Sequence, residues 1–295
     1  MRVLLTGADG QLGKSIIENK PPNHDLIITT KNDFDLSNEK LCFEKVFSYN
    51  PDWIINCGAF TKVDKAEEEE ELTFSINSDS VRYLSNALIE TKGRLLQIST
   101  DYVFDGTKNT PYTPYDPRNP QNIYGKSKAK AEKIIEDTLN STGQGLIIRT
   151  SWLMGPSGDN FALKILSLLE EREKLLVVSD QIGCPTTTFS LAKVCWKAIE
   201  KYYLGQNNHF PGILHWSDAG VASWYDVANA IKEIGLEMGI LKNPAQIVPI
   251  RSESYKSNSI RPKFSLLDSK ETHNLLEIPY VHWKKQLYEI FKNLS

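Results

Sequence analysis

The sequence predicts an α/β protein in which a doubly wound parallel sheet is followed by a smaller, mixed α/β lobe. Two observations lead to this prediction. Short apolar runs alternate with amphipathic stretches over the first half of the 295-residue chain, and this rhythm breaks after Trp152. Strands that alternate with helices indicate right-handed βαβ units, which form parallel sheets covered by helices on both faces. The length agrees with about two domains at roughly 150 residues each.

In the first half, short apolar runs predict strands and the longer stretches between them predict helices. The expected strands are Arg2–Thr6, Asp25–Thr29, Trp53–Asn56, Arg94–Ser99 and Gly145–Thr150. The expected helices are Gln11–Asn19, Glu39–Tyr49, one or two within Glu67–Thr91, and Ile123–Leu139. The pairs Leu4–Leu5 and Ile54–Ile55 contain no polar residue, which is typical of strands buried on both faces.

After Trp152 the pattern is less regular. The expected helices are Phe161–Glu173, Ser190–Tyr203, Ser223–Leu236 with Ser223 as its N-cap, and Trp283–Asn293. Val177–Thr188 is expected to be a strand that runs into a loop, and Arg251–Leu267 a polar loop. The tryptophans of this half are expected in the core of the second lobe: Trp216, Trp224 and Trp283. We place the boundary near residue 150, although the helix at 190–203 could return to pack on the sheet.

Composition excludes several classes of protein. The net charge of −3 argues against nucleic-acid binding that depends mainly on electrostatic attraction. No apolar run approaches the roughly 18 residues of a membrane helix. Four cysteines lie far apart, which favours free thiols in a reducing cytoplasm: Cys42, Cys57, Cys184 and Cys195. No two histidines have the spacing of metal ligands, so we expect no metal site: His24, His209, His215, His273 and His282.

A glycine-rich segment, Gly7-Ala8-Asp9-Gly10-Gln11-Leu12-Gly13, directly follows the first expected strand and opens the first helix. Glycine permits a tight turn, a close approach of the backbone to a pyrophosphate, and close packing of helix on strand. The helix N-terminus presents unpaired N–H groups to phosphates. The spacing is G-x-x-G-x-x-G rather than the G-x-G-x-x-G of many dehydrogenases, and a purely structural turn is the alternative. Its position favours dinucleotide binding at Gly7, Gly10 and Gly13.

The end of the second expected strand bears on the choice between NADH and NADPH. An acidic residue there usually binds the ribose 2′-hydroxyl of NAD. This chain instead has Thr30, followed by Lys31, which could contact a 2′-phosphate. The pattern weakly favours NADPH. If Lys31 is an ordinary solvated lysine, the choice between NADPH and NADH stays open.

Tyr124 and Lys128 lie four residues apart in an expected helix and therefore share one of its faces. A phenol exchanges protons poorly at neutral pH, and lowering its pKa from ~10 to ~7 requires ~4 kcal/mol. One ammonium group about 4 Å away supplies about that energy at an effective dielectric constant of about 20, and the positive charge of an oxidised nicotinamide would add to it. A Tyr-x-x-x-Lys pattern is also frequent by chance on helix surfaces. After a dinucleotide-type loop, it predicts proton transfer by Tyr124 with its pKa tuned by Lys128.

The segment Ser99–Gly106 begins at the C-terminal end of the expected strand Arg94–Ser99. This is the edge at which open α/β sheets bind ligands. Thr100 could donate a hydrogen bond to a substrate carbonyl beside Tyr124, and Asp101 could bind a sugar hydroxyl. The alternative is that Thr100 and Asp101 only cap a turn.

Seven segments together resemble the extended short-chain dehydrogenase/reductases and, within them, the dTDP-4-dehydrorhamnose reductase family. They are Gly7–Gly13, Ile55–Glu67, Ser99–Gly106, Tyr124–Lys128, Arg149–Trp152, Asp180–Thr186 and Arg261–Ser265. They span nearly the whole chain, and the strings Ser-Thr-Asp-Tyr-Val-Phe-Asp-Gly and Asp-Gln-x-Gly-x-Pro-Thr are quite specific to this subgroup. The resemblance implies a Rossmann-type NAD(P)-binding domain at residues 1–150 and a substrate-binding lobe at 151–295.

The resemblance also implies roles for individual residues. The matching catalytic residues are Thr100, Tyr124 and Lys128. The matching cofactor residues are Gly10, Gln11 and Leu12 at the pyrophosphate, Asp35 and Leu36 at the adenine side, Ala59, Phe60 and Thr61 along the cofactor, and Ser99 near the nicotinamide. The matching substrate residues are Asp101, Tyr102 and Trp152 at the deoxysugar, and Arg261, which would face the nucleotide diphosphate.

Two positions depart from the family pattern. Phe60 stands where many members have tyrosine, so one cofactor hydrogen bond would be lost while the ring is kept. Some members have a glutamate shortly after the glycine loop, in a Mg²⁺-linked dimer contact. Ser15 occupies the matching position here, which does not support that metal. We therefore expect a monomer or a weak homodimer.

The resemblance implies NAD(P)H-dependent reduction of the C4 ketone of dTDP-4-dehydro-L-rhamnose to dTDP-L-rhamnose, in nucleotide-sugar and cell-surface polysaccharide biosynthesis. One alternative is a non-catalytic NADP(H)-binding regulatory subunit, which could lose Tyr124 or Lys128 freely. Another is a nucleotide-sugar epimerase or dehydratase of the same superfamily, which would retain its NAD through the cycle. The presence of Thr100, Tyr124 and Lys128 together favours an enzyme over the regulatory subunit, whereas an epimerase or dehydratase shares these three residues.

Overall fold

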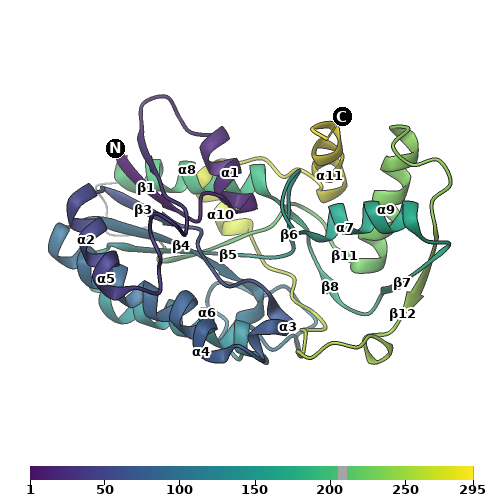
Figure 1. Cartoon of the computed structure of the whole chain (residues 1–295), viewed down its shortest axis with the longest axis horizontal. Coiled ribbons are helices and arrows are strands. Elements are labelled where there is room, and N and C mark those ends of the chain that lie inside the picture. Colours follow the sequence, from purple (N-terminus) through teal and green to yellow (C-terminus); the bar gives the residue numbers. More distant parts are fainter. Residues whose placement is uncertain (205–210, 295) are drawn as a thin grey trace.

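The computed structural model describes residues 1–204 and 211–294, without the side chains of residues 203 and 204. Its larger part is built on a six-stranded sheet with the order β10-β5-β4-β3-β1-β2, in which every pair of neighbours is parallel (Figure 1). The strands are β1 (Arg2–Thr6), β2 (Asp25–Ile28), β3 (Trp53–Asn56), β4 (Arg94–Thr100), β5 (Gly145–Thr150) and β10 (Ile213–Trp216). The predicted doubly wound parallel sheet is therefore confirmed.

Helices cover both faces of this sheet (Figure 1). On one face lie α1 (Gln11–Glu18), α8 (Thr188–Leu204) and α10 (Lys270–Leu276), and on the other α2 (Glu39–Tyr49), α5 (Ser80–Thr91) and α6 (Ile123–Thr138). Successive strand residues supply the two cores in turn: Leu4 and Ile54 face α2 and α5, whereas Leu5 and Ile55 face α1 and α8. This alternation follows from the two-residue period of a strand.

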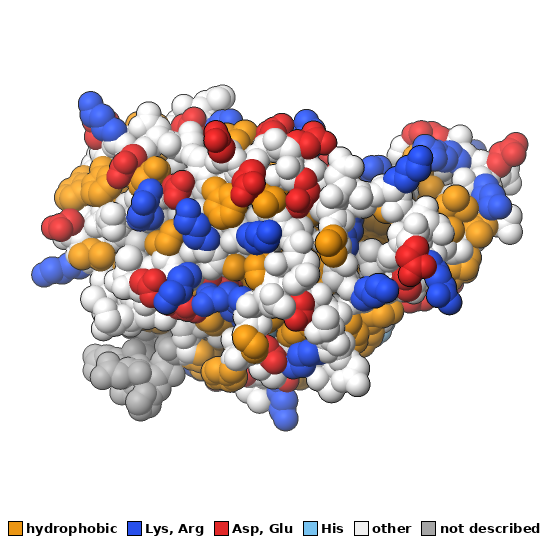
Figure 2. Space-filling model, turned by 90° about the horizontal axis from the view of Figure 1, so that it is seen from below, with side chains coloured by type: hydrophobic (Ala, Val, Ile, Leu, Met, Phe, Trp, Pro, Cys, Tyr) orange, Lys and Arg blue, Asp and Glu red, His pale blue; other side chains and the backbone are white. Residues whose placement is uncertain are grey.

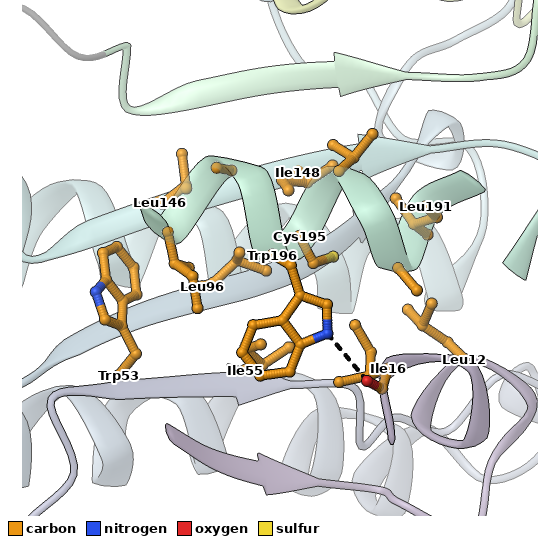
Figure 3. Packing of buried hydrophobic residues seen from close by; sticks show 14 of the residues in the cluster. Leu12, Ile16, Trp53, Ile55, Leu96, Leu146, Ile148, Leu191, Cys195 and Trp196 are labelled. Carbon is orange, nitrogen blue, oxygen red and sulfur yellow. Dashed lines mark hydrogen bonds between the residues drawn. The ribbon is translucent and has the colours of Figure 1, made fainter. Parts of the chain in front are cut away.

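Helix α8 joins the second half of the chain to the first core. Cys195 and Trp196 of α8 lie among buried side chains of α1 and the sheet, and the indole Nε1 of Trp196 donates a hydrogen bond to Ile16 O at 2.9 Å (Figure 3). Helix α8 therefore packs on the sheet, which is the alternative that the sequence left open for residues 190–203. Strand β10 also joins the sheet, so Trp216 lies in this core and not, as expected, in that of the second lobe. The division near residue 150 is crossed because β10 pairs with β5.

The second lobe has a core of its own. Its helices are α7 (Phe161–Glu171), α9 (Trp224–Glu237) and α11 (Trp283–Lys292), and its paired strands are β6 (Leu153–Met154) with β9 (Thr186–Thr187), β7 (Lys174–Val178) with β12 (Gln246–Ile250), and β8 (Ile182–Gly183) with β11 (Ala222–Ser223). Trp283 is buried in this core, as expected. Ser223 caps α9 by accepting a hydrogen bond from Asp226 N at 3.1 Å, which confirms the predicted cap.

The two parts are set apart by a hollow. Figure 2 shows the smaller lobe separated from the larger body, with positive and negative side chains interspersed over the visible face. In the described part of the chain, no helix combines the length and the apolarity that crossing a membrane requires. Residues of both parts line a single cavity, which is the candidate site.

Candidate active site

A cavity of about 410 Å³ lies where β1, β3, β4 and β5 end, between the sheet and the second lobe. Strand β1 has β2 on one side and β3 on the other, so the order in which successive strands are added across the sheet reverses at β1. Such topological switch points bind ligands in open α/β sheets. The predicted residues that line the cavity are Gly7, Gly10, Gln11, Leu12, Gly13, Ala59, Thr61, Ser99, Thr100, Asp101, Tyr102, Tyr124, Lys128, Trp152 and Arg261. The fold thus brings together most of the residues that were singled out separately.

The glycine loop has the geometry of a dinucleotide cradle. Gly7 has a left-handed φ of 65°, and a Cβ atom there would lie 2.7 Å from Gly58 N. A Cβ atom at Gly13 would collide with Gly7 O, so neither position accepts a side chain. Helix α1 begins after Gly10 with no side-chain cap, which leaves its first N–H groups available to a phosphate.

Four predicted cofactor residues do not line the cavity: Lys31, Asp35, Leu36 and Phe60. Lys31 is exposed, and Asp35 accepts hydrogen bonds from the Ser37 backbone N–H and hydroxyl at 3.0 and 2.8 Å. Leu36 is buried in the core beside Gly58. The adenine-side roles of Lys31, Asp35 and Leu36 therefore stay predictions.

Asn77 holds the loop that contains Phe60 and was not singled out by the sequence. Its amide accepts from Phe60 N at 2.7 Å and donates to Phe60 O and to Ser127 Oγ at 3.0 Å each. Asn77 lies in a π-helical turn, Ser75–Asp79, between α4 (Glu70–Phe74) and α5. Such turns are frequent at functional sites. Here the turn ties a cavity loop to the helix that carries Tyr124.

Helix α6 presents Tyr124 and Lys128 to the cavity. Asn122 caps this helix by accepting a hydrogen bond from Gly125 N at 2.7 Å. Lys128 is buried, and its Nζ donates to Ile98 O at 2.6 Å. Burial lowers the pKa of Lys128 to about 8, while the nearby Glu132 and Cys57 oppose the change. The ammonium form is therefore retained at neutral pH.

Within the protein alone, Lys128 is not among the groups that shift the pKa of Tyr124, so its expected tuning of this phenol stays a prediction. Burial raises that pKa to about 12, a hydrogen bond with the Thr100 side chain opposes the increase, and the negative charge of Asp101 adds to it. Tyr124 is therefore protonated at neutral pH. This is the form that a proton donor must have before reaction.

Asp101 is a buried carboxylate at the same cavity. Its Oδ1 accepts a hydrogen bond from Thr100 Oγ1 at 3.0 Å, whereas Oδ2 is buried without a hydrogen-bond partner among the described residues. Burial raises the pKa of Asp101 to about 6, with hydrogen bonds from Ser265 and Thr100 opposing the increase. Thr100 also caps the short helical turn after β4, because its Oγ1 accepts from Tyr102 N at 3.2 Å. The capping alternative for Thr100 is thus observed together with its place at the cavity.

A buried ionic network lies behind Lys128 and was missed by the sequence analysis. Glu132 is fully buried and binds Arg149 through two hydrogen bonds, of 2.9 and 2.7 Å. It also accepts from Arg118 at 3.2 Å and from the Ser99 hydroxyl at 2.5 Å. Paired in this way, the buried carboxylate is fully hydrogen-bonded. A signal existed: Glu132 lies one helical turn beyond Lys128.

Aromatic rings form the wall on the side of the second lobe. Trp152 has a left-handed φ of 46°, and its ring stacks on that of Trp224 with centroids 3.7 Å apart. The indole of Trp224 donates to Gln181 Oε1 at 3.1 Å. Gly183 allows this arrangement, since a Cβ atom there would lie 2.8 Å from the Trp152 ring. Trp224, expected in the core, packs against that core and also lines the cavity.

Arg261 lines the cavity but is engaged by another residue. Its guanidinium donates a hydrogen bond to Asp64 Oδ2 at 2.9 Å. Asp64 was not singled out, although it lies within a segment that carries the family resemblance. The expected role of Arg261 toward a diphosphate stays a prediction.

Within residues 1–204 and 211–294, no three His, Cys, Asp or Glu side chains are grouped so that they could hold a metal ion. His209 lies outside the described residues. Ser15, at the position of the Mg²⁺-linked contact, is buried and donates to Thr188 Oγ1 at 2.8 Å. The described cysteines are free, and Cys57 is the half-buried one that lines the cavity.

Comparison with known proteins places the chain in a family. A family model described as the RmlD substrate binding domain matches residues 1–295. A dTDP-4-dehydrorhamnose reductase of Aggregatibacter actinomycetemcomitans is 35% identical over 98% of both chains. The spore coat polysaccharide biosynthesis protein SpsK of Bacillus subtilis strain 168 is 37% identical over 100% of this chain and 98% of its own.

A solved structure agrees in fold over the full length. The crystal structure of dTDP-4-dehydrorhamnose reductase from Bacillus anthracis strain Ames, in complex with NADP, is 33% identical and covers 99% of both chains with a TM-score of 0.89. The family resemblance seen in the motifs is thereby confirmed. The chain belongs to the family of the RmlD substrate binding domain, together with dTDP-4-dehydrorhamnose reductases.

Proposed function

We propose that this protein reduces the C4 ketone of dTDP-4-dehydro-L-rhamnose to dTDP-L-rhamnose with NAD(P)H. One observation carries the proposal: Thr100, Tyr124 and Lys128 line the same cavity as the uncapped N-terminus of α1. The relatives named dTDP-4-dehydrorhamnose reductase support it. The product belongs to nucleotide-sugar and polysaccharide biosynthesis, and the free cysteines favour a cytoplasmic setting.

The cofactor side of the cavity fits a dinucleotide. The loop Gly7–Gly13 would hold the pyrophosphate, and Ala59, Thr61 and Ser99 would lie along the rest of the cofactor. The NADP complex of a relative supports NADP(H), and Lys31 adds a weak preference for the 2′-phosphate form. When bound, reduced nicotinamide supplies the hydride that attacks the sugar C4 carbon.

The chain's own residues supply the proton and hold the developing charge. The protonated Tyr124 would donate its phenolic proton to the carbonyl oxygen, and Thr100 would donate a hydrogen bond to the same oxygen. Lys128, held by Ile98 O, would bind the nicotinamide ribose and place a positive charge near Tyr124. Lys128, together with the positive charge that an oxidised nicotinamide would carry, would favour the phenolate that Tyr124 becomes after it donates its proton.

The substrate side combines apolar and acidic groups. The stacked rings of Trp152 and Trp224 would form an apolar wall of the pocket against the deoxysugar. The unpartnered Oδ2 of Asp101 would accept a hydrogen bond from a sugar hydroxyl. Tyr102 would complete the sugar pocket, and Arg261 would face the diphosphate. We propose a monomer or a weak homodimer, since the Ser15 hydroxyl donates its hydrogen bond within its own subunit.

The test is a turnover assay with NADPH and NADH against a small panel of dTDP- and GDP-linked 4-keto-6-deoxysugars. The expected result is loss of NADPH absorbance with dTDP-4-dehydro-L-rhamnose and formation of dTDP-L-rhamnose. Binding of NADPH without turnover of any sugar would instead identify a regulatory protein. Tightly retained NAD with no net consumption would identify an epimerase or dehydratase.

A further inference from the structure

One carboxylate connects the two sides of the cavity and has no role so far. Asp64, in the short helix α3 (Val63–Ala66), accepts hydrogen bonds from Ser257 Oγ and Ser259 Oγ at 2.7 Å each. It also accepts from Arg261 at 2.9 Å, across 197 positions of sequence. Burial would raise the pKa of Asp64, but these hydrogen bonds and the Arg261 charge hold it below its usual value. Asp64 is therefore a carboxylate that binds three residues of one distant segment.

That segment, residues 251–262, is named the strap here. It leaves β12 of the second lobe and runs past α3 toward α10 (Figure 1). Two further contacts tie it to the larger body: Asn258 donates to Glu68 Oε1 at 3.0 Å, and Asn122 donates to Ile260 O at 2.8 Å. Asn122 is the cap of α6, the helix that carries Tyr124. The strap thus joins the substrate lobe to the start of the catalytic helix.

Arg261 is the strap residue that reaches the cavity. One terminal nitrogen of its guanidinium binds Asp64, and its Nε is buried with no hydrogen-bond partner in the described part of the chain. The Tyr255 ring lies 6.0 Å from the guanidinium carbon. A guanidinium has five donors in a rigid fork, so fixing one side determines where the others point. Asp64 can therefore orient the Arg261 guanidinium, whose remaining N–H donors suit a phosphate oxygen.

We propose that Asp64 is a positioning residue that holds Arg261 and the strap in place for the anionic part of the nucleotide sugar. Asp64 does not touch the reacting atoms. Its removal should weaken substrate binding and leave the chemical step intact. The proposal rests on the proposed reductase function, and its test separates the two.

The first experiment measures steady-state kinetics of the full chain with NADPH and dTDP-4-dehydro-L-rhamnose. For Asp64→Asn we expect the KM of the nucleotide sugar to rise about tenfold, the effect of one charge-assisted contact. The kcat value should stay within about twofold, and the KM of NADPH should not change. Asp64→Glu should restore most of the affinity. The matched control is Glu233→Gln, since Glu233 forms an exposed ion pair with Lys284 at 2.6 Å, remote from the strap.

A double-variant comparison tests whether Asp64 acts through Arg261. If it does, Asp64→Asn combined with Arg261→Gln should raise the KM of the nucleotide sugar no further than Arg261→Gln alone. Additive increases would overturn the proposal. So would an unchanged KM in Asp64→Asn, or a loss confined to kcat.

A second measurement needs no turnover. Hydrogen exchange of the strap amides should become about tenfold faster in Asp64→Asn and stay unchanged in Glu233→Gln. If the wild-type protein turns over no nucleotide sugar, the proposed function fails, and strap exchange alone then decides whether Asp64 positions the strap. Unchanged exchange in Asp64→Asn would overturn the inference whatever the turnover.

Discussion

Two arginine–carboxylate pairs flank the same cavity and differ mainly in burial. Arg149 and Glu132, joined at 2.7 Å, expose 2% and 0% of their side chains. Arg261 and Asp64, joined at 2.9 Å, expose 25% and 43%. The first pair lies behind the side of the cavity that we propose for the cofactor, where Ser99 connects it to the cavity. The second lies at the side that we propose for the substrate, where Arg261 itself lines the cavity.

The difference in burial predicts a difference in role. A buried charge that loses its partner is left in a poorly polarisable interior, so the Arg149–Glu132 pair should be needed for folding. A half-exposed pair is hydrated with or without its partner, so the Arg261–Asp64 pair should add little to stability. It can therefore hold Arg261 in place for an anion without being needed for folding. The same chemistry thus gives a pair needed for folding on one side and a positioning contact on the other.

The largest effect is expected from breaking the buried pair. Glu132→Gln removes the negative charge beside Arg149 and Arg118 and should lower the free energy of unfolding by about 3–5 kcal/mol. Urea unfolding measures this change. The control is Glu136→Gln, which removes the partly exposed partner of Arg118 and should cost less than about 1 kcal/mol. Equal losses in the two variants would show that burial does not separate the pairs.

Asp101 sharpens the comparison because it is buried at the same cavity without an arginine partner in the described structure. Its pKa is about 6 in the folded protein against an ordinary 3.8, so the folded state binds its proton more tightly. Stability should therefore fall as the pH rises from about 4 to about 6, by at most about 3 kcal/mol.

Asp101→Asn should remove this part of the pH dependence of the free energy of unfolding. Urea unfolding at about pH 4 and about pH 7 measures it, with Asp159→Asn, an exposed acid at the same cavity, as the control. A wild-type and an Asp101→Asn protein with the same pH dependence would contradict the burial argument.

Tyr124→Phe separates the reaction from both supporting pairs. Loss of the phenolic proton should lower kcat by about 100-fold or more. The affinity for NADPH and the free energy of unfolding should stay unchanged. NADPH absorbance measures kcat, NADPH titration measures cofactor binding, and urea unfolding measures the free energy of unfolding. Tyr83→Phe, in helix α5, is the control outside the cavity. Near-native turnover would remove Tyr124 from the role of proton donor.

The smallest effect concerns the exposed pair. Asp64→Asn should lower the free energy of unfolding by less than about 1 kcal/mol. The loss should shrink between about 0.1 M and about 1 M salt, because the Debye length falls from about 10 Å to about 3 Å. The effect of Glu132→Gln should not depend on salt. Unfolding of both variants at the two salt concentrations checks this, and a salt-independent loss in Asp64→Asn would mean that the pair is effectively buried.

Much of the larger body could be predicted from the sequence because its signals are local. Glu39–Tyr49, Trp53–Asn56 and Gly145–Thr150 have the expected bounds, since apolar runs and helical spacing mark them within a few residues. β10 and β12 were not predicted. They are short strands whose existence depends on partners far away in the chain, β5 and β7. The sequence around them carries no comparable local pattern.

The candidate site divides in the same way. The glycine loop and the pair Tyr124 and Lys128 were found because their chemistry is encoded in short spacings. Asn77 and Trp224 were missed as site residues because an amide in a helical stretch and a tryptophan at a helix start look like ordinary packing residues. Spacing along a helix also says nothing about burial, which raises the pKa of Tyr124 to about 12.

The order of residues alone indicated the alternation of strands and helices, the glycine loop and the shared helix face of Tyr124 and Lys128, since neighbours within one turn or strand mark each of them. Only the tertiary structure decided which charges are buried and which distant groups meet. Glu132 meets Arg149 across 17 positions and Asp64 meets Arg261 across 197, and no local pattern encodes such encounters. They depend on how two separately packed cores close around one cavity.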